Sequence, residues 1–121
     1  MGQTVTILIV DDDPLVRDTV VRIVEAQGFR VFVADSAVKA MTILARENVD
    51  LLFTDIVMPG QDGIELAREA KKLRPNIRVL FSTGYFSRAR DAIGLGELLF
   101  KPLRAPQIEN AVAQALHGSR H

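Results

Sequence analysis

The stretch ILIVDDDPLVRDTVVRIVEAQG, residues 7–28, decides the fold because it joins one buried strand to one amphipathic helix. Its four consecutive apolar residues, Ile7 to Val10, are typical of a strand that is covered on both faces. Asp13 is a candidate N-cap, Pro14 suits the first helical position, and Gly28 is a stop signal. The predicted helix has one aliphatic face, formed by Val16, Val20, Ile23 and Val24.

The same strand-to-helix alternation recurs along the whole chain. The runs that favour strands are Val5 to Val10, Phe29 to Ala34, Val49 to Phe53, Ile77 to Phe81, and Leu98 to Phe100. Strands that alternate with helices of about 10 to 15 residues are typical of βαβ crossovers and a parallel sheet. The fold class that this pattern predicts is α/β.

Capping and stop signals place the remaining helices. Ser36 is a candidate N-cap for a helix that ends near Glu47, and Asp62 begins a third helix that Pro75 ends. A last helix is expected to start near Ala105 and Pro106. Between the fourth and fifth strands, three glycines leave room only for a short helix, about Ser87 to Ile93.

Composition limits the classes of function. The 121 residues suit one domain, residues 1–121, and the 48% hydrophobic content is enough for one core. Fifteen basic residues balance fifteen acidic ones, so we expect neither nucleic acid nor an anionic membrane as a partner. The chain has no cysteine, which excludes disulfides and thiol catalysis. With no apolar run near the roughly 20 residues of a membrane span, we expect a cytoplasmic protein.

Polar residues follow four of the five predicted strands. Asp11 and Asp12 follow the first strand, Asp55 the third, Thr83 the fourth and Lys101 the fifth. Because the carboxyl ends of parallel strands share one edge of the sheet, we expect these side chains to converge there. The aromatic residues nearby, Tyr85, Phe86 and Phe100, are expected to serve packing rather than recognition.

The negative charges of three carboxylates at one edge of the sheet need a positive charge or a proton to offset them. Two unit charges about 5 Å apart repel by roughly 3 kcal/mol at an effective dielectric constant near 20. A shared proton is one answer, but a set of oxygen ligands is what Mg²⁺ prefers, and we favour the metal. A carboxylate beside a cation can attack phosphorus, with Lys101 and the Thr83 hydroxyl as partners for the phosphoryl oxygens. No residue of the set is an evident general base, which argues against a rapid hydrolase.

Four ordered motifs, ILIVDDDP, LLFTDIVMPGQDG, VLFSTG and LLFKP, resemble those of the receiver domain of two-component response regulators, the family of the chemotaxis response regulator. The resemblance covers essentially the whole chain. It implies a single doubly wound, flavodoxin-like (βα)5 fold with a five-stranded parallel sheet of order 2-1-3-4-5. It also implies a cis peptide between Lys101 and Pro102.

The resemblance assigns roles to single residues. It makes Asp55 the phosphoacceptor, which receives its phosphoryl group from a histidine kinase or a histidine phosphotransfer protein. It also implies a downstream protein target whose identity stays open. The implied Mg²⁺ ligands are Asp11, Asp12, Asp55 and the backbone carbonyl of Val57. Thr83 becomes the switch hydroxyl and Lys101 the cation that contacts the phosphoryl group.

Two departures from the family pattern affect the switch. The Tyr or Phe that usually stands three residues before the lysine is Leu98 here, so the switch would consist of Thr83 and Leu98 without an aromatic gate. The segment from Gly84 to Phe100 is shorter than usual, so the fourth helix is expected to be short or irregular. The loops after the third and fourth strands are therefore expected to reorder on phosphorylation.

Two other functions remain open from the residues. A phosphatase of the haloacid dehalogenase type would use Asp11 as nucleophile and Asp13 as acid, but that family needs further acids after its lysine, and PLRAPQ follows Lys101 here. A module that only binds proteins would not need a complete phosphorylation set. The expected function is that of a phosphoacceptor and not of an enzyme with turnover.

Overall fold

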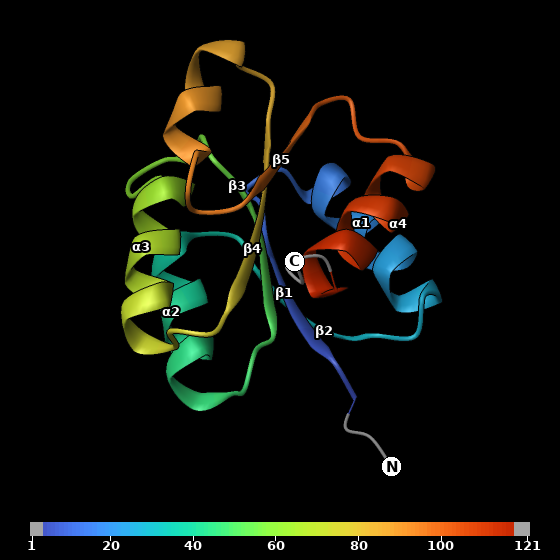
Figure 1. Cartoon of the computed structure of the whole chain (residues 1–121), viewed down its shortest axis with the longest axis horizontal. Coiled ribbons are helices and arrows are strands. Elements are labelled where there is room, and N and C mark those ends of the chain that lie inside the picture. Colours follow the sequence, from blue (N-terminus) through green and yellow to red (C-terminus); the bar gives the residue numbers. More distant parts are fainter. Residues whose placement is uncertain (1–3, 118–121) are drawn as a thin grey trace.

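A computed structural model describes residues 4–117 and contains one parallel five-stranded sheet of order β2-β1-β3-β4-β5 (Figure 1). The strands are β1 Thr6–Val10, β2 Arg30–Ala34, β3 Leu51–Asp55, β4 Arg78–Thr83 and β5 Glu97–Phe100. The predicted α/β class and strand order are confirmed. Among the described residues, no helix is both long and apolar enough to cross a membrane.

The helices lie in two layers, one on each face of the sheet. They are α1 Pro14–Ala26, α2 Ala37–Arg46, α3 Gly63–Leu73, the 3-10 helix η1 Phe86–Ala92, and α4 Ala105–His117. Figure 1 shows α1 and α4 on one face and α2 and α3 on the other, with η1, in orange, above the beginning of α3. The sheet is therefore covered on both sides, as its continuous apolar strands require.

Alternate residues of the central strands supply the two cores. On β1, Leu8 and Val10 face the core under α2 and α3, whereas Ile7 and Ile9 face the core under α1 and α4. Since successive side chains of a strand point to opposite faces, an ILIV run fills both cores at once.

Two central strands extend further than the sequence pattern predicts. β3 ends at Asp55 rather than Phe53, and β4 ends at Thr83 rather than Phe81, because Asp55 pairs with Ser82 and Thr83 pairs with Phe100 of β5. β3 also begins two residues late, at Leu51, since Asp50 accepts the backbone N–H of Thr6 at 2.8 Å. The polar residues at the strand ends are thus part of the rigid sheet.

The helix caps are where the sequence predicts them. Asp13 caps α1 by accepting the N–H of Leu15 at 2.9 Å, and Asp62 caps α3 by accepting the N–H of Glu65 at 2.9 Å. The short fourth helix is a 3-10 helix that lies one residue earlier than predicted. It ends before Gly94, whose φ of 84° suits glycine best.

Candidate functional site

Three acidic residues meet at the carboxyl edge of the sheet. Asp11 and Asp12 directly follow β1, and Asp55 is the last residue of β3. One carboxylate oxygen from each residue lies within 4.8 Å of the other two. Asp11 and Asp55 are only 3% and 6% exposed, so their charges are largely removed from water, whereas Asp12 is exposed.

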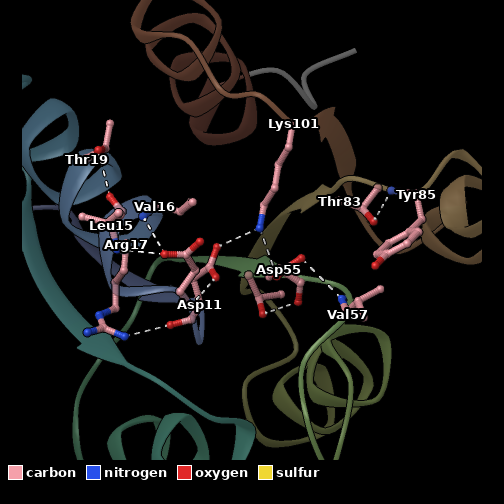
Figure 2. Close-up of polar contacts among 12 residues, drawn as sticks. Asp11, Leu15, Val16, Arg17, Thr19, Asp55, Val57, Thr83, Tyr85 and Lys101 are labelled. Carbon is pink, nitrogen blue, oxygen red and sulfur yellow. Dashed lines mark hydrogen bonds and ion pairs between the residues drawn. The ribbon is translucent and has the colours of Figure 1, made fainter.

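Lys101 lies between the two buried carboxylates (Figure 2). Its Nζ is 3.2 Å from Asp11 Oδ2 and 3.1 Å from Asp55 Oδ2. The residue directly follows β5, and its peptide bond to Pro102 is cis, as the resemblance implies. The lysine contacts residues 90 and 46 positions away along the chain, and only the sheet order brings them together.

Burial and charge act in opposite directions on Lys101 in this cluster, whereas burial prevails for Asp55. Desolvation raises the pKa of Asp55 above its ordinary value, and the Asp11 charge adds to this effect although Lys101 opposes it. Burial alone would lower the pKa of Lys101, but the carboxylates of Asp55 and Asp11 outweigh it and raise that pKa. One ammonium thus faces three carboxylates and leaves the cluster short of positive charge.

The donor set fits a hard divalent cation. It consists of carboxylate oxygens alone, and three of them lie close enough to share one ion. Asp11, Asp12 and Asp55 would hold such an ion. Val57 lines the same cleft, and its N–H donates to Asp55 Oδ1 at 3.3 Å. The role of its carbonyl as a further ligand stays a prediction.

Thr83 ends β4 at the same edge and is fully buried. Its Oγ1 accepts the backbone N–H of Tyr85 at 3.1 Å, a contact drawn in Figure 2. A hydroxyl has one hydrogen to donate besides the lone pairs that accept, so this bond leaves Thr83 able to donate.

The residue beside Thr83 on β5 is Phe100, whereas Leu98 pairs with Phe81, deeper in the sheet. Leu98 is half-buried against the core under α2 and α3. Phe100 packs against Phe86, with ring centroids 4.5 Å apart and the rings tilted by 52°. The packing expected of the nearby aromatic residues holds for this contact, although Phe86 is 77% exposed. For Tyr85, which is 58% exposed, the expectation of a packing role is wrong, because η1 is too short to cover it.

The cleft around the acidic residues has two walls. One wall follows β3 and the other follows β4. The lining residues are Asp11, Asp12, Asp13, Asp55, Val57, Met58, Pro59, Gly84, Tyr85 and Lys101. Asp13 Oδ1 accepts the capping N–H groups of Leu15 and Val16, which hold this side chain at the start of α1.

A glycine fixes the wall that follows β3. A Cβ on Gly63 would lie 2.1 Å from the carbonyl oxygen of Asp55, so the first residue of α3 packs directly on the end of β3. The Gly63 N–H also donates to the Ile56 carbonyl at 2.8 Å. This close approach ties the start of α3 to the backbone of the central acidic residue.

Comparison with known proteins shows the family of this chain. The family model described as the response regulator receiver domain matches residues 7–113. The chain belongs to this family of receiver domains. The sequence resemblance is thereby confirmed, and the match takes in the strands, the acidic cluster and Lys101.

Individual relatives agree with the family match. The receiver domain is 36% identical to the response regulator receiver protein CpdR of Brucella abortus, over 91% of this chain and 95% of that protein. It is 33% identical to sporulation initiation phosphotransferase F of Bacillus subtilis, over 91% and 92% of the two chains. A CheY-like receiver structure from Methanospirillum hungatei superposes with a TM-score of 0.87 at 29% identity, over 94% of each chain.

Sequence reasoning missed two arginines of the receiver domain. Arg17 Nη1 donates to the Asp11 carbonyl at 2.9 Å and fixes the loop that carries the acidic residues (Figure 2). Arg88 lies in η1 and bonds to the cap of α3, Asp62, at 2.8 Å. The position of Arg88, four residues after Gly84, does not by itself indicate a contact with Asp62. Arg17, in contrast, stands one turn after the Asp13 cap, where a side chain can reach back to the preceding loop.

Proposed function

We propose that this receiver domain, residues 1–121, accepts a phosphoryl group on Asp55 from a phosphohistidine of a histidine kinase or a histidine phosphotransfer protein, with Mg²⁺ bound. The observation that carries the proposal is the position of Lys101 Nζ, within 3.2 Å of the carboxylates of both Asp11 and Asp55. The phosphorylated form then changes contacts with a protein target.

The transfer is a substitution at phosphorus. An Asp55 carboxylate oxygen forms the new P–O bond while the P–N bond to the donor imidazole breaks, and the imidazole leaves with the electron pair of that bond. Lys101 offsets negative charge on the phosphoryl oxygens, and the Thr83 hydroxyl donates to one of them. When bound to Asp11, Asp12 and Asp55, Mg²⁺ would supply further charge compensation for the transferring group.

Several features favour an acceptor over an enzyme that turns over. Asp13, the acid that a phosphatase of the dehalogenase type would need, accepts the N–H groups of Leu15 and Val16 as the cap of α1. The described residues that line the cleft include no histidine to act as a general base. The similarity to sporulation initiation phosphotransferase F also favours phosphotransfer.

The switch that we propose starts from the Thr83 hydroxyl. On phosphorylation this hydroxyl turns toward the phosphoryl group, and the loops after β3 and β4, which form the cleft walls, reorder with it. Leu98 lies further from the cleft than Phe100, which pairs directly with Thr83. The β5 residue beside the Thr83 hydroxyl is therefore the aromatic Phe100, although Leu98 is aliphatic.

Intact-mass measurement tests the acceptor. The wild type and Asp55→Asn are incubated with Mg²⁺ and a small phosphodonor such as acetyl phosphate. We expect the wild type alone to gain the mass of one phosphoryl group, and the gain to disappear when EDTA removes the metal. Asp35→Asn, which changes an exposed acid of a surface ion pair, is the control and should gain the mass as the wild type does. An equal gain in Asp55→Asn would remove Asp55 from this role.

A further inference from the structure

Arg88 makes two short ion pairs outside the acidic cluster. Its Nη2 is 2.8 Å from Asp62 Oδ2 and its Nε is 2.7 Å from Asp91 Oδ2. The Arg88 and Asp62 side chains are 29% and 28% exposed, so the pair is partly shielded from water. The hydrogen bonds to both carboxylates raise the pKa of Arg88, although burial opposes this.

The ion pair between Arg88 and Asp62 connects the two walls of the cleft, whereas the pair with Asp91 lies within η1. Asp62 ends the loop that follows β3. Val57, Met58 and Pro59 of this loop line one wall. Arg88 lies in η1, directly after Gly84 and Tyr85 of the other wall. The guanidinium therefore ties the segment after Asp55 to the segment after Thr83.

A chain of hydrogen bonds leads from Arg88 to the Thr83 hydroxyl. The Arg88 N–H donates to the Tyr85 carbonyl at 3.1 Å, and the Tyr85 N–H donates to Thr83 Oγ1 at 3.1 Å. Since Thr83 Oγ1 accepts from Tyr85, the direction of its own O–H depends on where Tyr85 is held. Tyr85 itself is exposed, so few side-chain contacts hold it in place.

We propose that Arg88 is a positioning residue of the phosphoryl cleft: its ion pair with Asp62 fixes the two walls and aims the Thr83 hydroxyl at the phosphoryl oxygens. This inference rests on the proposed function. Arg88 contacts neither Asp55 nor Lys101 through any bond in the structure, and it acts through Tyr85 and Thr83. A cleft that is ordered in advance binds a phosphoryl group more tightly because less ordering remains to be done on binding.

The test uses beryllium fluoride as a phosphoryl mimic, titrated at saturating Mg²⁺, and a separate titration with Mg²⁺ alone. We expect Arg88→Gln to weaken beryllium fluoride binding on the order of fivefold and to leave Mg²⁺ affinity unchanged, because the acidic cluster does not include Arg88. Arg88→Lys keeps the charge but loses the forked guanidinium that bonds to two carboxylates. Its affinity for beryllium fluoride should fall between those of Arg88→Gln and the wild type.

A double-mutant cycle assigns the effect to the bond between the walls. Asp62→Asn keeps an N-cap side chain on α3 but removes the charge that holds Arg88. The double variant should bind beryllium fluoride no more weakly than the weaker of the two single variants. Asp62→Asn alone carries the test if Arg88→Gln does not fold. Lys39→Gln, which removes a surface ion pair on α2, is the matched control and should bind as the wild type does.

Three results would overturn the inference. Binding of beryllium fluoride by both Arg88→Gln and Asp62→Asn within twofold of the wild type would show that the walls do not need the ion pair. An equal fall in Mg²⁺ affinity would show a general loss of structure. If the wild type bound Mg²⁺ but not beryllium fluoride, the proposed function itself would fail, and the role of Arg88 with it.

Discussion

Asp55 is buried beside Asp11, and one lysine contacts both carboxylates. Because burial, followed by the Asp11 charge, raises the pKa of Asp55 in the folded protein, the ionised form is less favourable there than in the unfolded chain. The unfolded state therefore loses this proton first. Stability falls as pH rises from the unfolded pKa of Asp55 through its folded pKa, and the loss persists at neutral pH.

Replacing this carboxylate should therefore stabilise the protein. We expect Asp55→Asn to raise the free energy of unfolding at pH 7, in EDTA, on the order of 1 kcal/mol, because the amide carries no charge to desolvate or to repel Asp11. Denaturant titration measures the difference, which should shrink as pH falls through the raised folded pKa of Asp55 and vanish once pH is below its unfolded pKa. The exposed control Asp35→Asn should change stability by less than about 0.5 kcal/mol. A less stable Asp55→Asn at pH 7 would contradict the assigned electrostatics.

The pKa of Asp62 shifts in the opposite direction from that of Asp55. Burial alone would raise its pKa, but its bonds to the Glu65 N–H and to Arg88 outweigh this and lower it. A depressed folded pKa contributes stability above the unfolded pKa, and this contribution is lost as pH falls through the folded pKa. We expect Asp62→Asn to lower stability at pH 7 by about 0.5–1 kcal/mol, allowing for solvent screening. The difference from the wild type should close on acidification, and a constant difference from pH 7 to pH 2 would exclude the ion pair as its source.

The residues of the cleft differ in how far sequence could predict them. Asp11, Asp55, Thr83 and Lys101 end strands or directly follow them, and the rule that strand ends share an edge is enough to gather them. Arg88 reaches Asp62 across 26 positions, and its contact depends on the path of η1. No spacing rule covers such a contact, because an irregular segment has no fixed periodicity.

At the level of elements, the junction between β3 and α3 leaves no room for an added side-chain atom. The first residue of α3, Gly63, leaves no space for a Cβ against the Asp55 carbonyl. We expect Gly63→Ala to lower the free energy of unfolding by about 1–3 kcal/mol, because backbone rather than a flexible side chain has to move. Thermal or denaturant unfolding measures this cost.

Gly84→Ala is the matched control for this substitution. A Cβ on Gly84 meets nothing within 4 Å, so the same added methyl group should change stability by less than about 0.5 kcal/mol. Equal losses in the two variants would mean that the close approach between α3 and β3 is not what makes Gly63 necessary.

The existence of the helices and strands, and their sequence along the chain, are easier to predict than the residues at which they end. Asp13, Ser36 and Asp62 accept helix N–H groups at the predicted caps, since a short polar side chain before an apolar stripe satisfies these donors locally. The apolar runs place the ends of β3 and β4 two residues early, because the last two residues of each strand include polar ones. Pairing between neighbouring strands, which is a long-range property, extends both strands to their polar ends.

At the scale of the whole molecule, the sheet between two helix layers brings the acidic residues at the ends of β1 and β3 to one place, and metal binding should therefore report on the entire fold. A ligand that binds only the folded state raises the free energy of unfolding, by about 1.4 kcal/mol at ten times its dissociation constant. We expect Mg²⁺ to raise the melting temperature of the wild type, and EDTA to reverse the change. Asp11→Asn and Asp55→Asn should lose most of the gain, and an undiminished gain in both would place the metal elsewhere.

The strand order illustrates what pattern alone leaves open. Alternating strands and helices establish an α/β sheet, but the position of β1 between β2 and β3 follows from long-range packing that no local run encodes. The family motifs supplied that order. The exposure of Tyr85 and Phe86 is beyond local patterns for the same reason, because it depends on how much the short η1 covers.

The most direct test of the account is a crystal structure of the wild type with Mg²⁺ and beryllium fluoride. The account predicts beryllium bonded to an Asp55 carboxylate oxygen, the metal held with Asp11 and Asp12, and Lys101 and Thr83 in contact with fluorine atoms. Beryllium fluoride bonded to Asp11, or bound away from this cleft, would contradict the assignment of Asp55 as the phosphoacceptor.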